Sequence, residues 1–268
     1  MSHGAPPSAE TQQRIVELLG AAGEGRWDRI EVVDSTGSTN ADLVGRAHDP
    51  GIVGTVRITT DQVAGRGRHA RVWSAPAGGQ LAISAVLAAG TQADTLGWLS
   101  LATGVAAAQA IERASGVRPV LKWPNDVLVN EKKVAGILAE FTATDAGGVV
   151  VVGIGINTNM TADDLPVPTA TSLLEETGTR VDVARLAAQF LLALAAQPWP
   201  ADIASVAARY RERCDTLGRR IRLSLPGDRI VEGTAVDVDR RGRIVVDTGT
   251  GEPTVAAAGD VLHLRPVL

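Results

Sequence analysis

The stretch Val120-Leu-Lys-Trp-Pro-Asn-Asp-Val-Leu-Val-Asn-Glu-Lys-Lys-Val-Ala-Gly-Ile-Leu-Ala-Glu-Phe141 decides the fold. It contains three runs rich in aliphatic and β-branched residues, and a fourth run follows: Val120–Lys122, Val127–Val129, Val134–Phe141 and Val149–Ile156. Turn-forming residues, rather than long helical segments, separate these runs. The sequence therefore predicts neighbouring strands of a mixed or antiparallel β-sheet.

The flanking sequence alternates between strand-like and helix-like segments. Further strands are predicted at Ile30–Val33, Val53–Thr60 and Leu81–Ala88. Apolar residues at helical spacing predict helices at residues 9–22, 41–47, 98–115, 183–194 and 203–214. We expect an α+β fold in which helices back a mixed β-sheet.

The character of the sequence changes after Gly218. Short β-branched runs are separated there by tight turns such as Pro226-Gly-Asp228, a pattern that is typical of a small β-barrel. We place the boundary near Leu217. The sequence therefore predicts a helical segment at residues 1–29, a main domain at residues 30–217 and a C-terminal barrel at residues 218–268.

Composition and charge exclude several classes of protein. The net charge is −4, from 26 basic and 30 acidic residues, whereas a protein that wraps duplex DNA usually carries a basic excess. The single cysteine, Cys214, cannot form an intrachain disulfide and lies on the apolar face of a predicted helix, as a buried thiol would. Neither a signal peptide nor the ~20 apolar residues of a membrane span is visible. We expect a cytoplasmic protein that does not enter a membrane.

The most unusual segment is Gln62-Val-Ala-Gly-Arg-Gly-Arg-His-Ala-Arg71, which combines glycines and arginines. Glycines let a backbone approach a ligand closely, and arginines bind carboxylate and phosphate groups in a bidentate manner. The segment favours a loop that holds an anionic ligand. A solvated flexible loop and a nucleic-acid-binding loop stay open as alternatives. The aromatic residues that a single-strand binder uses are absent within the segment.

Two further motifs carry polar or glycine residues at strand ends. Lys122-Trp-Pro-Asn-Asp126 places a lysine, an amide and a carboxylate at a sharp turn, and Asp126 is able to meet Mg²⁺ or to cap the turn. Gly136 and the segment Gly153-Ile-Gly-Ile-Asn157 weaken their strands unless something approaches closely there. A plain hairpin turn explains the first motif equally well, and a β-bulge explains Gly136.

Several familiar catalytic signatures are missing from the sequence. No GxxxxGK[ST] phosphate loop occurs, and Gly153 and Gly155 lack the third glycine of a dinucleotide fingerprint. The four histidines do not show the spacing of metal ligands, so we expect no tightly bound metal. If the protein is an enzyme, these absences favour catalysis by binding and electrostatics over a covalent intermediate on the protein.

Taken together, the motifs resemble the biotin–protein ligase family. The resemblance rests on their order and spacing: Ser38-Thr-Asn40, Gln62 with Gly65-Arg-Gly-Arg68, Lys122-Trp-Pro-Asn-Asp126, Lys133-Val-Ala-Gly-Ile-Leu138, and Gly153 to Asn157. It covers residues 30–268. It implies a synthetase-like catalytic domain with a small SH3-like β-barrel after it. It also implies a two-step reaction, in which biotin and MgATP form biotinoyl-AMP and the biotin is then transferred to a lysine of a biotin carboxyl carrier domain.

The resemblance also implies roles for individual residues. It assigns biotin binding to Ser38, Thr39, Asn40, Gln62, Gly65, Arg66, Gly67, Arg68, Lys122, Gly136, Ile137 and Gly155. It assigns ATP or adenylate binding to Arg66, Arg68, Arg71, Trp73, Asn125, Asp126, Lys133 and Asn157. Lys122 and Arg66 are the implied catalytic residues, with Lys122 between the biotin carboxylate and the α-phosphate. Asp126 is the implied ligand of Mg²⁺.

The resemblance has limits that shape the remaining expectations. The family loop usually continues Arg-x-Gly-Arg, whereas this sequence has Arg68-His-Ala-Arg71, so Ala70 restricts the backbone. Family repressors carry an N-terminal winged helix-turn-helix for which this sequence has no room, so we expect no specific DNA binding and a monomer or weak homodimer. Lipoate or octanoate ligation and a non-enzymatic binding module are the alternatives.

Overall fold

The computed structural model describes residues 8–89, 93–145 and 147–264. The expectation that no signal peptide is present concerns the first residues, and residues 1–7 lie outside the described part. Within that part, no helix is both long and apolar enough to cross a membrane.

A seven-stranded mixed sheet forms the centre of the described main domain. Its order is β1 (Arg29–Val32), β2 (Thr55–Thr59), β5 (Gln80–Ala88), β9 (Val149–Asn157), β8 (Lys132–Thr142), β7 (Asp126–Val129) and β6 (Val120–Lys122). Strands β1 and β2 run parallel, and the other neighbouring pairs run antiparallel. The predicted mixed sheet is therefore confirmed.

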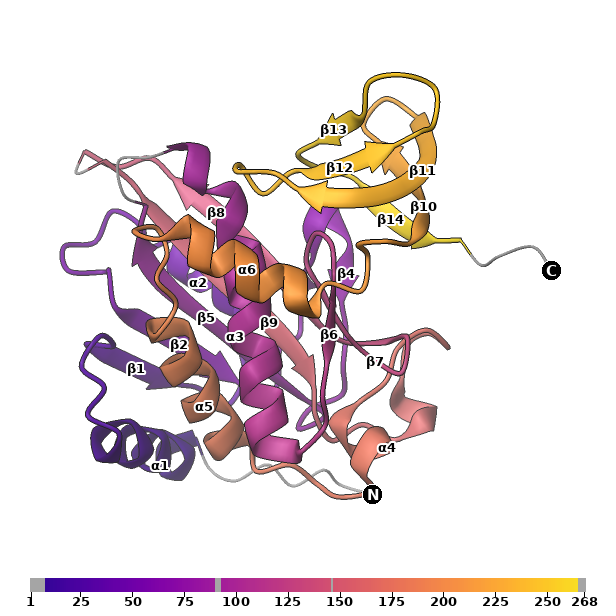
Figure 1. Cartoon of the computed structure of the whole chain (residues 1–268). Coiled ribbons are helices and arrows are strands. Elements are labelled where there is room, and N and C mark those ends of the chain that lie inside the picture. Colours follow the sequence, from indigo (N-terminus) through magenta and orange to yellow (C-terminus); the bar gives the residue numbers. More distant parts are fainter. Residues whose placement is uncertain (1–7, 90–92, 146, 265–268) are drawn as a thin grey trace.

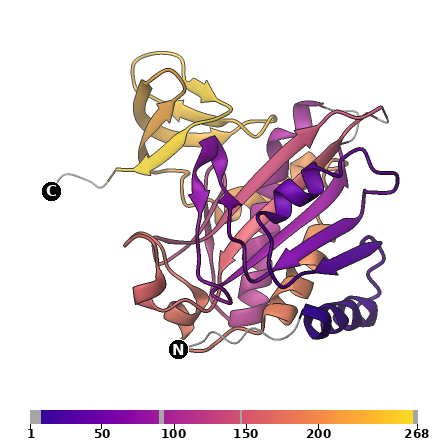
Figure 2. The same cartoon turned by 180° about the vertical axis from the view of Figure 1, so that it is seen from behind.

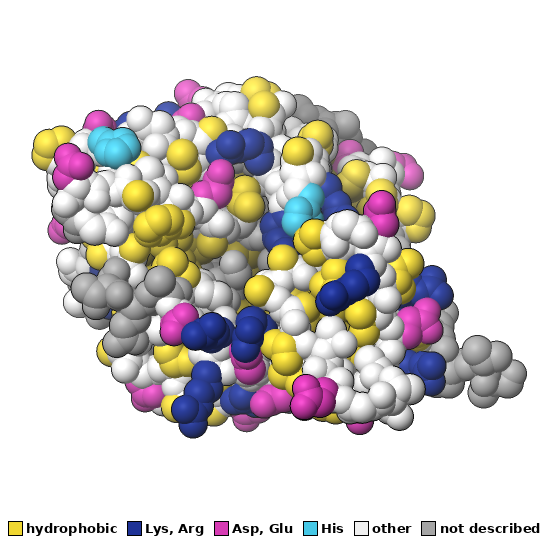
Figure 3. Space-filling model, turned by 90° about the horizontal axis from the view of Figure 1, so that it is seen from above, with side chains coloured by type: hydrophobic (Ala, Val, Ile, Leu, Met, Phe, Trp, Pro, Cys, Tyr) yellow, Lys and Arg dark blue, Asp and Glu magenta, His cyan; other side chains and the backbone are white. Residues whose placement is uncertain are grey.

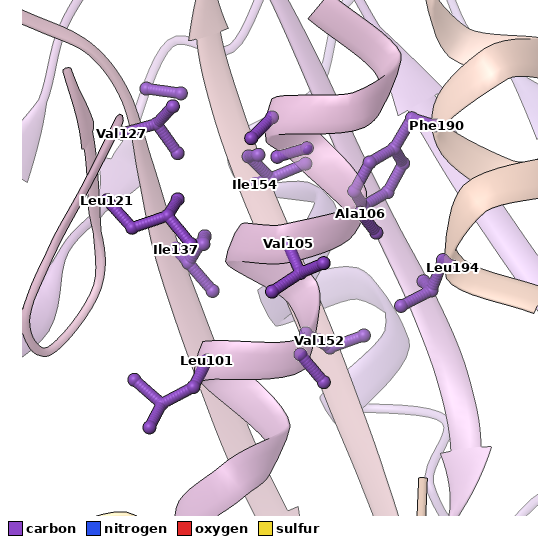
Figure 4. Packing of buried hydrophobic residues seen from close by; sticks show 14 of the residues in the cluster. Leu101, Val105, Ala106, Leu121, Val127, Ile137, Val152, Ile154, Phe190 and Leu194 are labelled. Atoms are coloured by element: carbon purple, nitrogen blue, oxygen red, sulfur yellow. The ribbon is translucent and has the colours of Figure 1, made fainter. Parts of the chain in front are cut away.

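One face of this sheet is covered by three long helices, as Figure 1 shows: α3 (Gly97–Ser115), α5 (Val183–Ala195) and α6 (Ile203–Arg213). Figure 4 shows Val105 and Ala106 of α3 lying among Ile137, Ile154 and Phe190 of the neighbouring elements. Full burial of one such aliphatic side chain stabilises a fold by about 1.5–3 kcal/mol. The packing of these helices therefore holds the strands of the sheet in place.

The remaining helices are shorter or peripheral. Helix α1 (Ser8–Ala21) packs against α5 and the edge strand β1. Helix α2 (Thr39–Val44) lies on the face of the sheet opposite the three long helices. Helix α4 (Leu173–Thr177) comes after strand β9 in the sequence. Single 3₁₀ turns occur at Arg68–Ala70, Ala93–Thr95 and Ala162–Asp164. Helix α2 begins two residues before its predicted start, because the Ser38 side chain accepts a hydrogen bond from the Ala41 N–H.

Strand β9 shows why the second face of the sheet is bare at its centre. Successive side chains of a strand point to opposite faces. Val150, Val152, Ile154 and Ile156 therefore belong to the main core under the helices, whereas Val149 and Val151 pack with Leu43 of α2. Further along that second face come Gly153 and Gly155, which have no side chains. The result is a patch of sheet beside α2 that lacks side chains of its own, so other segments can approach its backbone closely.

The C-terminal sheet has the order β13 (Thr254–Ala256), β12 (Ile244–Asp247), β11 (Arg229–Val238), β10 (Arg220–Leu225) and β14 (Asp260–His263). All of its described neighbours pair antiparallel. The predicted small β-barrel is confirmed. The three-part division with its boundary at residue 217 stays a prediction.

A two-stranded ribbon, β3 (Gly65–Arg66) and β4 (Val72–Trp73), is formed by the glycine- and arginine-rich segment. Figure 2 shows this ribbon directly beneath the C-terminal barrel. The ribbon was predicted as a loop, because strands of two residues have no periodicity that sequence reasoning could detect. The ribbon places Trp73 against the glycines of the sheet, Gly136 and Gly155.

Candidate active site

A pocket of about 220 Å³ opens over the glycine patch of the sheet. We call its base the floor, formed by Ala82, Ser84, Gly136, Gly153 and Gly155. We call residues 65–73 the roof, because Arg66, Gly67, Arg68, Arg71, Val72 and Trp73 line the pocket from that side. The Lys122–Asp126 turn forms one wall, and Asp260 and Val261 of the barrel complete the rim.

A buried polar cluster lies at one end of the floor. The hydroxyls of Thr39 and Ser84 lie 2.7 Å apart, and Ser84 donates to the Asn40 side-chain oxygen at 2.6 Å. The Gln62 side-chain oxygen accepts from the Thr39 backbone N–H at 3.0 Å. All four side chains are buried. Such a cluster is suited to a ligand that carries its own hydrogen-bond donors and acceptors.

The floor glycines are required by close approach. A Cβ atom at Gly153 would lie 1.9 Å from the Asn40 side-chain oxygen, and one at Gly155 would lie 2.5 Å from the Trp73 ring. At Gly136 a Cβ would meet the side chains of Lys133 and Trp73 at 3.0–3.1 Å. The close approach expected at Gly136 is therefore present, and the side chains of Lys133 and Trp73 make it.

Two lysines flank the Asp126 carboxylate at the pocket wall. Lys133 Nζ lies 2.6 Å from Asp126 Oδ1 and 5.7 Å from the centre of the Trp73 ring. Burial lowers the pKa of the Lys122 ammonium, and the Asp126 carboxylate opposes that shift. Cationic groups in a partly desolvated pocket attract anionic ligands more strongly than they would in water.

Arginines tie the roof to three other parts of the molecule. Arg66 Nη2 lies 3.1 Å from Glu140 Oε2, and Arg68 Nη1 donates to Asn125 Oδ1 at 3.2 Å. Arg71 forms an ion pair with Asp260 of the barrel. Burial lowers the pKa of the Arg68 guanidinium, with Asp260 opposing. The barrel therefore helps to hold the roof.

The turn at the tip of the roof is strained. His69 and Ala70 have φ angles of +55° and +58°, in the left-handed region that favours glycine. The sequence identified Ala70 as a restriction on this backbone. The structure shows that Ala70 lies in this turn, where both non-glycine residues adopt a backbone conformation that favours glycine.

The structure gathers all but two of the predicted site residues at the pocket. Gly65 is buried beneath it, where a Cβ would lie 2.5 Å from both the Gln62 amide nitrogen and the Trp73 carbonyl oxygen. Asn157 is also buried, and its amide donates to the Thr171 carbonyl at 2.9 Å. The ligand contacts predicted for these two residues stay predictions, as do those of the residues that line the pocket.

Sequence reasoning missed several lining residues. Ser84 is a lone hydroxyl in the apolar run of β5, and that irregularity was a usable signal. Gly153 was noted for close approach, but it was not assigned to the site. Asp260 gave no local signal, since its partner Arg71 lies 189 positions away.

The described residues include no preformed cluster of metal ligands. No group of three or more His, Cys, Asp or Glu side chains that could hold a metal occurs among them. Asp126 offers one carboxylate, which Lys133 already pairs. Because Mg²⁺ is commonly held by one or two carboxylates together with substrate phosphates, Asp126 fits a metal that arrives with a nucleotide.

The fold and the pocket define a class of protein: an α+β domain with a cationic pocket over the glycines of its sheet, and with a barrel at the pocket rim. Family models narrow this class. Residues 31–157 match the biotin/lipoate A/B protein ligase family, and residues 216–264 match the biotin protein ligase C-terminal domain.

Known relatives narrow the class further. The biotin–[acetyl-CoA-carboxylase] ligase of Mycobacterium tuberculosis is 43% identical over 267 residues, covering 97% of each chain. The bifunctional ligase/repressor BirA of Escherichia coli is 29% identical, covering 86% of this chain and 72% of its own. The biotin protein ligase of Aquifex aeolicus, solved with biotin and ATP, has a TM-score of 0.75 at 25% identity, covering 88% of this chain and all of its own. The chain belongs to the biotin–protein ligase family.

Proposed function

We propose that this protein is an ATP-dependent biotin–protein ligase. It forms biotinoyl-5′-AMP and transfers the biotin to a lysine of a biotin carboxyl carrier domain, such as that of acetyl-CoA carboxylase. The observation that carries the proposal is one pocket in which a buried polar cluster and two lysines lie at the same glycine floor.

The polar cluster favours biotin over lipoate or octanoate. The ureido group of biotin has N–H donors and a carbonyl acceptor, which the hydroxyls of Thr39 and Ser84 and the amides of Asn40 and Gln62 can meet. An aliphatic acyl chain would cover these buried polar groups without bonding to them. A site built to hydrogen-bond one ligand discriminates strongly against a ligand that lacks the partners.

In the first step, a biotin carboxylate oxygen attacks the α-phosphorus of ATP, and the bond to pyrophosphate breaks. The two reacting groups are both anionic, so they must be brought together against their repulsion. Lys122 and Lys133 flank the wall where these anions would meet, and stabilisation of the charge that develops there lowers the barrier. Asp126 would hold Mg²⁺ that arrives with the nucleotide, and the metal would neutralise phosphate charge.

The roof is suited to retain the intermediate. Trp73 offers an indole face for the adenine ring, and Arg66, Arg68 and Arg71 offer guanidinium groups to phosphate oxygens. An acyl adenylate hydrolyses when water reaches it, so a roof that closes over the ligand protects the intermediate. In the second step, the carrier lysine amine attacks the acyl carbon and AMP leaves.

A pyrophosphate assay tests the proposal. The purified full chain with MgATP should release pyrophosphate only when biotin is added. Release that depends on octanoate or lipoate instead of biotin would replace the proposal with that alternative. Release with none of the three acids would remove the proposal altogether.

Nucleic-acid binding gains no support from the face of the molecule that Figure 3 shows. Figure 3 shows basic and acidic side chains interspersed over the face seen from above, rather than a continuous basic stripe. Arg66 and Arg71 of the roof form ion pairs with Glu140 and Asp260. Sequence-independent nucleic-acid binding depends on unmatched positive charge along the backbone path.

A further inference from the structure

Glu140 lies beside the pocket, at the end of the segment Lys132–Glu140, and the sequence assigned it no role at the site. It follows Gly136 and Leu138 on the same face of β8, because alternate residues of a strand share a face. Gly136 and Leu138 line the pocket, whereas Glu140 lies just beyond its edge. Its side chain is partly exposed.

One oxygen of the Glu140 carboxylate joins the floor to the roof. Glu140 Oε2 accepts from Asn40 Nδ2 at 2.8 Å and from Arg66 Nη2 at 3.1 Å. Asn40 in turn accepts from Ser84 within the polar cluster. Arg66 is the last residue of β3 and pairs with Val72 across the ribbon. A continuous hydrogen-bonded path therefore runs from the buried cluster, through Glu140, to the first arginine of the roof.

Building on the proposed function, we propose that Glu140 is a positioning residue that sets the Arg66 guanidinium at the pocket rim before the anionic ligand arrives. A guanidinium carries five N–H donors, so the bond from Nη2 leaves donors for a phosphate or carboxylate. An arginine side chain that is already restricted loses less conformational entropy when the ligand binds. The arrangement therefore favours ligand retention.

The competing possibility is that Glu140 draws Arg66 away from the ligand. The position of Glu140 outside the pocket lining argues against this, because its carboxylate does not occupy the space over the floor. Asn40 also holds the same oxygen from the floor side, which fixes the carboxylate behind the guanidinium. The two possibilities predict opposite effects of removing the charge.

The first test uses the ligand-free protein and trypsin, which cuts after Arg66, Arg68 and Arg71. Glu140→Gln keeps an oxygen that can accept from Asn40 but loses the charge that pairs with Arg66. We expect cleavage within residues 66–71 to be roughly threefold to fivefold faster than in the unchanged protein, the range for one partly exposed ion pair. Glu232→Gln is the matched control, since it removes a similar pair with Arg222 on the barrel. Equal cleavage of Glu140→Gln and the unchanged protein would overturn the proposal.

The second test measures release of biotinoyl-AMP. Glu140→Gln should release it roughly threefold to fivefold faster, and Arg66→Gln combined with Glu140→Gln should release it no faster than Arg66→Gln alone. Unchanged or slower release from Glu140→Gln, or additive effects in the double variant, would overturn the proposal. If the unchanged protein makes no biotinoyl-AMP, the proposed function fails, whereas the trypsin result still decides whether Glu140 orders Arg66.

Discussion

The floor and the roof of the pocket are held by different kinds of interaction. The floor belongs to strands β5, β8 and β9, whose long antiparallel ladders are buried under three helices. The ribbon of the roof has only two residue pairs. The ion pair between Arg71 and Asp260 links the roof to the barrel, and the Arg71 side chain is 64% exposed. Exposed ion pairs contribute about 0.2–1 kcal/mol each. The floor is therefore preformed and suited to select the ligand, whereas the roof is marginally held and suited to open and close.

The largest expected loss of activity comes from removing the lysines of the pocket wall rather than the arginines of the roof. Lys122→Ala and Lys133→Ala should each lower biotin-dependent pyrophosphate release at least about 100-fold, because each removes a charge placed at the reacting anions. The variant with the greater loss identifies the lysine nearer the α-phosphate. Lys132→Ala is the control, since Lys132 is the exposed neighbour in the sequence. Normal release from both pocket variants would contradict the assignment of the wall.

The charge of Lys122 gives a pH test of the same wall. Burial lowers the pKa of Lys122, so its charge should be lost at a lower pH than that of an ordinary lysine. As pH rises, adenylation by the unchanged protein should therefore fall earlier than adenylation by Lys122→Arg, whose guanidinium stays protonated. Pyrophosphate release followed from neutral to alkaline pH measures this. Coinciding profiles would mean that the Lys122 charge does not act in the step.

A substitution in the floor, where Gly155 touches Trp73 of the roof, should reduce biotin affinity even without ATP. Gly155→Ala places a Cβ 2.5 Å from the Trp73 ring, so the indole must move or the strand must shift. Overpacking of this kind costs about 1–3 kcal/mol. Calorimetric titration should show weaker biotin binding in the absence of ATP. Gly20→Ala, where no atom lies within 4 Å of the added Cβ, should bind as the unchanged protein does. Equal affinities for both variants would show that the floor is not the biotin site.

A substitution in the roof should alter the retention of biotinoyl-AMP without changing how the floor binds biotin. Arg71→Gln removes the tie to Asp260 of the barrel. Release of biotinoyl-AMP should be roughly twofold to fivefold faster, as expected for one exposed ion pair, whereas biotin affinity without ATP should stay unchanged. Asp260→Asn should reproduce this result. A change in biotin affinity larger than the change in adenylate release would contradict the division between floor and roof.

The smallest expected effect concerns the tip of the roof. Ala70 has a φ of +58°, which glycine adopts without the cost that a Cβ brings. Ala70→Gly should therefore favour the closed turn and slow the release of biotinoyl-AMP about twofold, since the greater freedom of the open glycine loop offsets part of the relief. The rate of release in a filter assay measures this. Faster release would show that loop entropy outweighs strain.

The same division explains which features the sequence could reveal. The strands of the floor were predicted because their apolar runs are bounded by turns, and Gly136 and Gly155 stood out inside them. The ribbon β3–β4 and the tie between Arg71 and Asp260 could not be predicted, since two-residue strands have no period and the tie joins distant segments. No role could be assigned to Glu140 from the sequence, because its contacts come from two partners on separate elements.

Calorimetric titration of biotin into the full chain, followed by addition of MgATP, tests whether a preformed floor selects biotin. We expect biotin to bind without nucleotide, because the floor is preformed, and MgATP then to produce an adenylate that the roof retains. Binding of octanoate or lipoate in place of biotin, or no binding until ATP is present, would contradict a preformed floor that selects biotin.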